Sequence, residues 1–130
     1  LDRQELVRRT TTDSLRSLVE DGHRVLVVEP FPVLLRDPLS CLSGAVDIGE
    51  CTFPPLAEGI EEPLERALAE QLDGLAAIDL DNDVCPGEVA CPAIIKEVIV
   101  RRDRHHLTPE FAATLTPRLG DKIDEMLGTN

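Results

Sequence analysis

The stretch 94-IIKEVIVRRDRHHLTPEFAATL-115 reads as a strand, a charged turn and the start of a helix. Residues 94–101 are rich in isoleucine and valine, which favour extended backbone. Thr108 is a good N-cap for a helix, and Pro109 suits the first helical position. The stretch therefore predicts a strand that leads through a polar turn into a helix, as in α/β folds.

Helices and strands alternate along the rest of the chain too. The predicted elements are helices over 3–19, 56–72 and 108–127, and strands over 24–28, 75–80 and 94–101. Pro63 falls inside the second helix, which is therefore expected to begin near that residue. The last helix is expected to bury one stripe, made of Phe111, Leu115, Leu119, Ile123 and Leu127.

This alternation predicts an α/β fold with a three-layer architecture, in which helices cover both faces of a parallel sheet. Three short strands make a thin sheet. We therefore expect residues 1–130 to be the C-terminal part of a single larger domain. The chain does not begin with Met and has no Met before position 126, so it is expected to start in mid-protein.

The chain has four cysteines, Cys41, Cys51, Cys85 and Cys91. They lie in two segments rich in proline and glycine, and the spacings C-x9-C and C-x5-C favour two short local loops. Two local disulfides and an oxidising compartment are predicted. Two alternatives stay open: four reduced cysteines, or a zinc site that combines the second cysteine pair with His105 and His106.

The charge of the chain limits its partners. Acidic residues outnumber Lys and Arg by 25 to 13, which gives a net charge of −12 over 130 residues. Such a surface repels phosphate backbones and anionic lipids, so no nucleic-acid partner is expected. No apolar run approaches the roughly 20 residues that a membrane-spanning helix needs.

Asp103 and His106 stand three residues apart between the predicted third strand and the last helix. A turn of this length can bring the carboxylate against the imidazole, fix the tautomer of the ring and leave its other nitrogen to accept a proton. The carboxyl ends of strands in an open α/β sheet are also where ligands bind. From spacing alone, a solvated polar turn that caps a helix is the more common explanation of these residues.

Residues 24–123 resemble the end of the SGNH (GDSL-type) hydrolase domain, in the form fused to bacterial membrane acyltransferases that O-acylate surface glycans. The matching features are a P-x-P motif at residues 30–32, both cysteine pairs in order, and Asp103-Arg104-His105-His106-Leu107-Thr108. The resemblance implies a flavodoxin-like fold, with His106 as catalytic base, Asp103 as its orienting acid and His105 as a cleft neighbour. It implies no cofactor and no metal. The family often has an aromatic residue where this chain has Arg101, a departure expected to alter the cleft wall or the substrate charge.

The nucleophile that the resemblance implies is absent from this chain. Its four serines, Ser14, Ser17, Ser40 and Ser43, do not follow a strand and a glycine. Asn82 and Asn130 are also in the wrong context for an oxyanion hole. The chain is therefore expected to supply the catalytic acid and base. A missing N-terminal half, either disordered, removed or present as a second polypeptide, would supply the serine.

The main hypothesis is thus the C-terminal half of an extracytoplasmic serine esterase or O-acyltransferase domain, completed by that N-terminal half. Its expected partners are an acylated glycan or glycolipid and a membrane acyltransferase domain, through which the protein would be tethered to the membrane. The alternative is a non-catalytic, acidic, disulfide-stapled module that binds glycan or protein. A metal-binding domain is a third, minor hypothesis.

Overall fold

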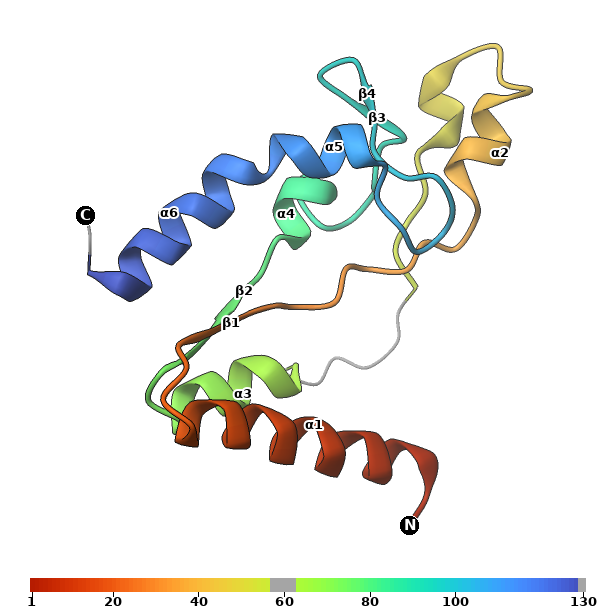
Figure 1. The fold of residues 1–130 in the computed structure, drawn as a ribbon. Coiled ribbons are helices and arrows are strands. Elements are labelled where there is room, and N and C mark those ends of the chain that lie inside the picture. The colour runs from red at the N-terminus through yellow and green to blue at the C-terminus, as the bar shows by residue number, and fades with distance from the viewer. Residues whose placement is uncertain (57–62, 129–130) are drawn as a thin grey trace. The chain divides into compact units, whose positions relative to one another are not determined.

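Two short apolar strands pair in parallel, as the sequence predicts. In the computed structural model, which describes residues 1–56 and 63–128, β1 (Val25–Val28) pairs with β2 (Leu75–Ile78) (Figure 1). Val25 lies opposite Leu75, and Val28 lies opposite Ile78. Branched aliphatic side chains fit the pleated surface of a sheet, which explains why these two runs become strands.

Two helices accompany these strands. α1 (Arg3–Glu20) begins after Asp2, whose Oδ1 accepts a hydrogen bond from the Glu5 N–H at 2.8 Å. The helix ends before Gly22, which has a φ of +91° that residues with a side chain rarely adopt. α3 (Leu64–Gln71) follows Pro63, as expected, and contacts β2. The part of the predicted second helix over 57–62 lies outside the described residues.

Contacts between residues divide the chain into two compact units. Unit 1 comprises residues 1–29, 61–79 and 122–130 and contains β1, β2, α1 and α3. Unit 2 comprises residues 30–60 and 80–121 and contains both cysteine loops and the Asp103–His106 turn.

A buried carboxylate in unit 1 is paired with an arginine of α3. Glu29, directly after β1, is only 4% exposed and accepts from Arg66 Nη2 at 2.7 Å. The same Nη2 donates to Asp79, directly after β2, at 3.0 Å. Arg66 therefore links the segments that leave the carboxyl ends of the two parallel strands.

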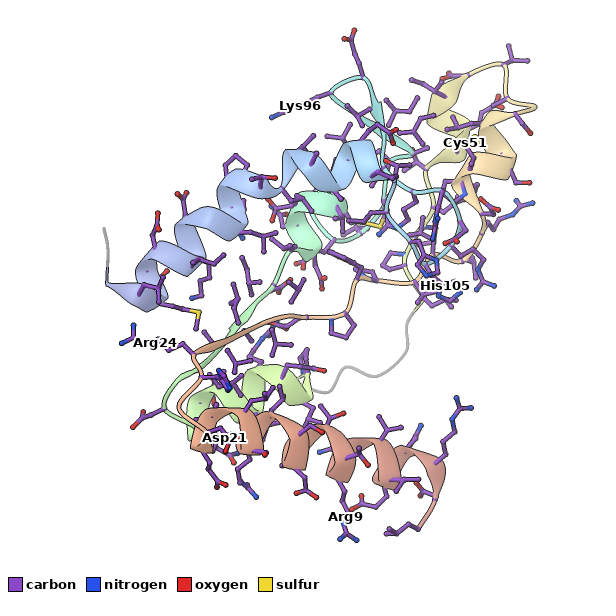
Figure 2. All side chains as sticks on the ribbon, in the orientation of Figure 1. Arg9, Asp21, Arg24, Cys51, Lys96 and His105 are labelled. Atoms are coloured by element: carbon purple, nitrogen blue, oxygen red, sulfur yellow. A yellow bond between two sulfur atoms is a disulfide. The ribbon has the colours of Figure 1, made fainter. Side chains whose placement is uncertain are left out.

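The predicted third strand is wrong. Residues 94–99 form an antiparallel hairpin of two short strands, β3 (Ile94–Ile95) and β4 (Val98–Ile99). The chain reverses at Lys96 and Glu97, whose φ angles are +50° and +66°. Lys96 lies at the tip of this hairpin (Figure 2). Apolar residues flank this turn on both sides, so the sequence pattern resembles that of one continuous strand.

The predicted last helix is interrupted. α5 (Pro109–Thr114) starts at the predicted N-cap, where Thr108 Oγ1 accepts a hydrogen bond from the Phe111 N–H at 3.1 Å. α6 (Thr116–Leu127) follows after Leu115. Pro117 has no N–H to donate to the preceding turn, which favours a break at this point.

The predicted apolar stripe is buried only in its first part. Phe111 and Leu115 are 3% and 6% exposed, whereas Ile123 and Leu127 are 45% and 48% exposed. The prediction of one buried stripe is therefore wrong for the last two turns of α6.

The cysteine loops contain short helices: α2 (Pro38–Leu42), the 3₁₀ helix η1 (Ile48–Cys51) and α4 (Asp81–Val84). Disulfides join Cys41 to Cys51 and Cys85 to Cys91. Phe53 and Cys91 exchange two backbone hydrogen bonds, of 3.1 and 2.8 Å, which connect the two loops. The buried core of unit 2 includes Leu34, Leu80, Val84, Ala93, Val100, Phe111 and Leu115.

The fold class is therefore α/β, with helices and a small parallel sheet. Over residues 1–56 and 63–128 the strands form one parallel pair and one antiparallel pair, not a sheet of three parallel strands. In the same residues, no helix is long and apolar enough to cross a membrane.

Reduction of the two disulfides is expected to destabilise unit 2. They close loops with sequence separations of 10 and 6 residues, for which loop entropy gives about 2–3 kcal/mol each. Denaturant unfolding with and without reductant measures this difference. Non-reducing proteolysis should yield peptides joined as Cys41–Cys51 and Cys85–Cys91, and four free thiols would contradict the assignment.

The Arg66→Met variant is expected to lower the free energy of unfolding by about 1–3 kcal/mol, because the buried Glu29 carboxylate loses a charged partner. Adding Glu29→Gln to this variant replaces the buried carboxylate by a neutral amide and should recover part of the lost stability. Equal stability of the single and double variants would show that the carboxylate does not depend on Arg66.

Candidate active site

Main-chain hydrogen bonds close the turn that carries Asp103 and His106. Arg101 and Leu107 form an antiparallel bridge at its base, and the Arg102 N–H donates to the His106 carbonyl at 3.0 Å. The turn follows the β3–β4 hairpin and precedes α5. The expectation that it follows a strand of the parallel sheet is therefore wrong.

The Asp103 carboxylate organises the interior of this turn. Its Oδ1 accepts hydrogen bonds from the backbone N–H groups of His105 and His106, at 2.7 and 2.6 Å. Its Oδ2 lies 2.8 Å from Nδ1 of the His106 ring. The backbone N–H groups of His106 and His105, followed by the His106 side chain, hold the pKa of Asp103 far below its ordinary value. The carboxylate is thus ionised at neutral pH.

The His106 ring is held at one nitrogen and accessible at the other side. With Oδ2 of an ionised carboxylate as its partner, Nδ1 carries a proton, so Nε2 is the basic nitrogen of the neutral ring. The His106 side chain is 62% exposed, which leaves room for a reacting group to approach. This arrangement can orient an imidazole for proton transfer.

His105 lies beside His106 but makes a different contact. The centroids of the two rings are 6.2 Å apart with the planes tilted by 53°. His105, which is labelled in Figure 2, is exposed. Its backbone N–H, rather than its ring, is hydrogen-bonded to Asp103. Because the His105 ring lies next to that of His106, a group that binds at His106 can also contact His105.

A segment distant in sequence supports the turn. The Leu34 N–H donates to the Arg104 carbonyl at 3.0 Å, and Arg104 Nε donates to the Leu34 carbonyl at 2.9 Å. Leu34 is completely buried. Sequence reasoning did not identify these two residues as support for the turn, because arginine at 104 resembles any charged loop residue and nothing local marks its partner at 34.

Arg101 does not line a cleft. It is 1% exposed, and its Nη2 donates to the Pro32 carbonyl at 3.3 Å. The expectation that it alters the cleft wall or the substrate charge is therefore wrong, because its guanidinium is buried within unit 2.

The zinc alternative is also wrong. Cys85 and Cys91 are bonded to each other, so their sulfurs are not thiolates that could join His105 and His106 as ligands.

The four serines do not follow a strand. Ser14 and Ser17 lie in α1, Ser40 lies in α2, and Ser43 caps the end of α2. The hydroxyl of Ser43 donates to the Ser40 carbonyl at 2.7 Å.

A shallow cavity lies over the first cysteine loop. It measures about 450 Å³ and is lined by Arg36, Asp37, Ser40, Cys41, Glu50 and Phe53. The Arg36 guanidinium carbon lies 5.7 Å from the centre of the Phe53 ring, within reach of a cation–π contact. This surface combines charged groups of both signs with the face of an aromatic ring.

Acid titration is expected to show that Asp103 stays ionised below the ordinary midpoint. Because its pKa is lowered, its stabilisation of the turn is complete above pH about 4 and is lost as the pH falls further. The carboxyl ¹³C shift of Asp103 measures this transition. His106→Ala removes one of the three hydrogen bonds and should move the midpoint part of the way back. A wild-type midpoint near 4 would contradict the expectation.

A protein-family model matches most of the chain. The sequence model of the SGNH domain (fused to AT3 domains) matches residues 2–121. No curated protein and no solved structure matches. The match covers nearly the whole chain, including the Asp103–His106 turn and both disulfides, and it connects the chain with acyltransferase domains. The chain thus belongs to the family of SGNH domains fused to AT3 domains.

Proposed function

We propose that this chain is the C-terminal half of an extracytoplasmic SGNH-type serine esterase or O-acyltransferase domain that acts on acyl groups of glycans or glycolipids. The observation that supports it most strongly is the 2.8 Å contact between Asp103 Oδ2 and His106 Nδ1, with the ring exposed to an incoming group. In this proposal Asp103 is the orienting acid, His106 is the general base and His105 is a cleft neighbour.

The reaction would proceed by covalent catalysis. A serine hydroxyl attacks the acyl carbonyl while its proton passes to His106 Nε2, and the imidazolium then protonates the departing alcohol. Water or a sugar hydroxyl next attacks the acyl-enzyme and loses its proton to Nε2, and the imidazolium passes this proton to the departing serine oxygen, which regenerates the free serine. Asp103 stays ionised and stabilises the imidazolium, which agrees with the lowered pKa of its carboxyl.

The serine and the oxyanion donors would come from an N-terminal half, present in a longer protein or as a second polypeptide. The positions of the four serines, in α1 and around α2, support a nucleophile from elsewhere. Among the described residues β1 pairs with β2 alone. Its other edge is a natural place for a further parallel strand, which would extend the sheet toward a three-layer fold.

Two observations support the proposed location and parent protein. Disulfides persist in oxidising compartments and are rare in the cytosol, so the two bridges favour an extracytoplasmic position. The family is defined by its fusion to AT3 domains, which supports a membrane acyltransferase domain as the partner and a tether to the membrane. Neither a cofactor nor a metal is needed for the proposed chemistry.

A second candidate function is a non-catalytic module that binds glycan or protein. The cavity lined by Arg36, Asp37 and Phe53 favours it, because aromatic faces and charged groups together bind sugar rings and hydroxyls. In this case the Asp103–His106 turn would contribute to binding or to the structure, and not to catalysis.

A fluorophosphonate serine probe separates the two functions. The protein as isolated is treated with the probe, and the denatured masses of all polypeptides are then measured. A tag on a longer or separate polypeptide supports a serine esterase completed by this chain. The absence of any tag, with a single mass for 130 residues, would move the binding module to first place.

In the complete domain, Asp103→Asn and His106→Ala are each expected to lower kcat for an acetyl ester about 10³–10⁴-fold or more, since the base loses its orientation or is removed. Arg102→Gln, in the same turn but exposed, is the matched control and should change kcat little. Unchanged turnover in the Asp103→Asn variant would show that another residue is the acid.

A further inference from the structure

Arg101 is the largest of the side chains that are almost fully buried in the described part of the chain, with 1% of its surface exposed. Arginine is rarely buried to this extent without a charged partner, because removing a cation from water is strongly unfavourable. A long apolar side chain could fill the same volume without that cost. The presence of a guanidinium here therefore calls for a specific interaction.

The guanidinium connects two segments of unit 2. Nη2 donates to the Pro32 carbonyl at 3.3 Å, and the carboxylate of Asp81, in the first turn of α4, acts on the cation electrostatically. Within residues 1–56 and 63–128, Nε and Nη1 have no hydrogen-bond partner. The hydrogen bond to the Pro32 carbonyl is thus the contact that fixes the guanidinium, which lacks a complete set of hydrogen bonds.

The main chain of Arg101 forms the base of the Asp103–His106 turn. Arg101 is bridged to Leu107, and the next rung is the hydrogen bond from the Thr108 N–H to the Val100 carbonyl at 3.0 Å. A shift of the Arg101 side chain would therefore move the point at which the turn opens. The carboxylate and the ring of the pair are only two and five residues along the chain from that point.

The segment that receives the guanidinium also contacts the turn at a second residue, Arg104. Pro32 accepts from Arg101, while Leu34 exchanges hydrogen bonds with Arg104 at 3.0 and 2.9 Å. Two arginines thus attach the turn to the same short segment, one through a buried side chain and one mainly through its backbone and Nε.

We propose that Arg101 is a positioning residue, whose buried guanidinium, hydrogen-bonded to the Pro32 carbonyl, holds the base of the turn so that Asp103 orients His106. Its role in catalysis rests on the proposed function. Its geometric effect on the imidazole does not, and it can be measured in this chain without any enzymatic activity.

The competing explanation is that Arg101 only fills space in the core. Arg101→Met keeps an unbranched side chain and removes the charge and the donors, whereas Arg101→Lys keeps the charge and one donor group. Arg102→Met is the matched control, since Arg102 is exposed and lies in the same turn. Amide dispersion in NMR spectra and thermal unfolding establish whether each variant is folded.

The measurement is the tautomer of His106, read from long-range ¹H–¹⁵N correlations of the imidazoles in the ¹⁵N-labelled chain at a pH where the ring is neutral. His23, which is exposed and lies in unit 1, is the internal reference. In the wild-type chain and in Arg102→Met we expect His106 to be protonated at Nδ1. In Arg101→Met the population should shift toward the distribution of His23, with a smaller shift in Arg101→Lys.

A folded Arg101→Met chain with the wild-type tautomer at His106 would overturn the proposal, because the residue would then be core filling. If that variant does not fold, Arg101→Lys decides in the same way: a shifted tautomer supports the proposal and a wild-type tautomer overturns it. Unchanged turnover in Asp103→Asn would contradict the catalytic role of the pair, but it would leave the tautomer result intact, so the two failures are distinguishable.

Discussion

The ionised carboxylate of Asp103 has two tasks at once, and the geometry of the candidate site depends on it. Through Oδ1 it gathers two backbone N–H groups that would otherwise face the inside of a tight turn, and through Oδ2 it contacts the ring of His106. A neutral amide at this position could accept at its oxygen but could not serve all three donors with the same charge. The conformation of the turn and the orientation of the imidazole therefore depend on the same carboxylate.

Residues at the base of the turn and in a distant segment hold the turn in place. The antiparallel bridge between Arg101 and Leu107 closes the turn, and Leu34 is hydrogen-bonded to Arg104 within the turn. Each of these contacts joins residues of unit 2, so the candidate site and both disulfides belong to one compact unit. The parallel strands belong to the other unit, where Arg66 ties together the residues that follow them.

Local patterns predicted the two strands of the parallel pair and the Thr108 cap, since these depend on apolar periodicity or on residues close in sequence. The pairing of Asp103 with His106 was predicted from the family resemblance, because spacing alone favoured a solvated polar turn. The hairpin at residues 94–99 was missed because Lys96 and Glu97 reverse the chain without the glycine or asparagine that usually marks such a turn. The break after Leu115 was missed because the apolar period continues across it. The burial of Arg101 has no local signal at all, since its acceptor is 69 residues away.

The first cysteine of this chain pairs with the second and the third with the fourth, and this has a consequence for how the disulfides form. Partners separated by 10 and 6 residues meet often in an unfolded chain, because the entropy of closing a loop grows with its length. Four cysteines allow three pairings, and the native one is favoured by this proximity before any tertiary structure exists. Oxidation can thus proceed segment by segment, in the order in which the cysteines appear along the chain.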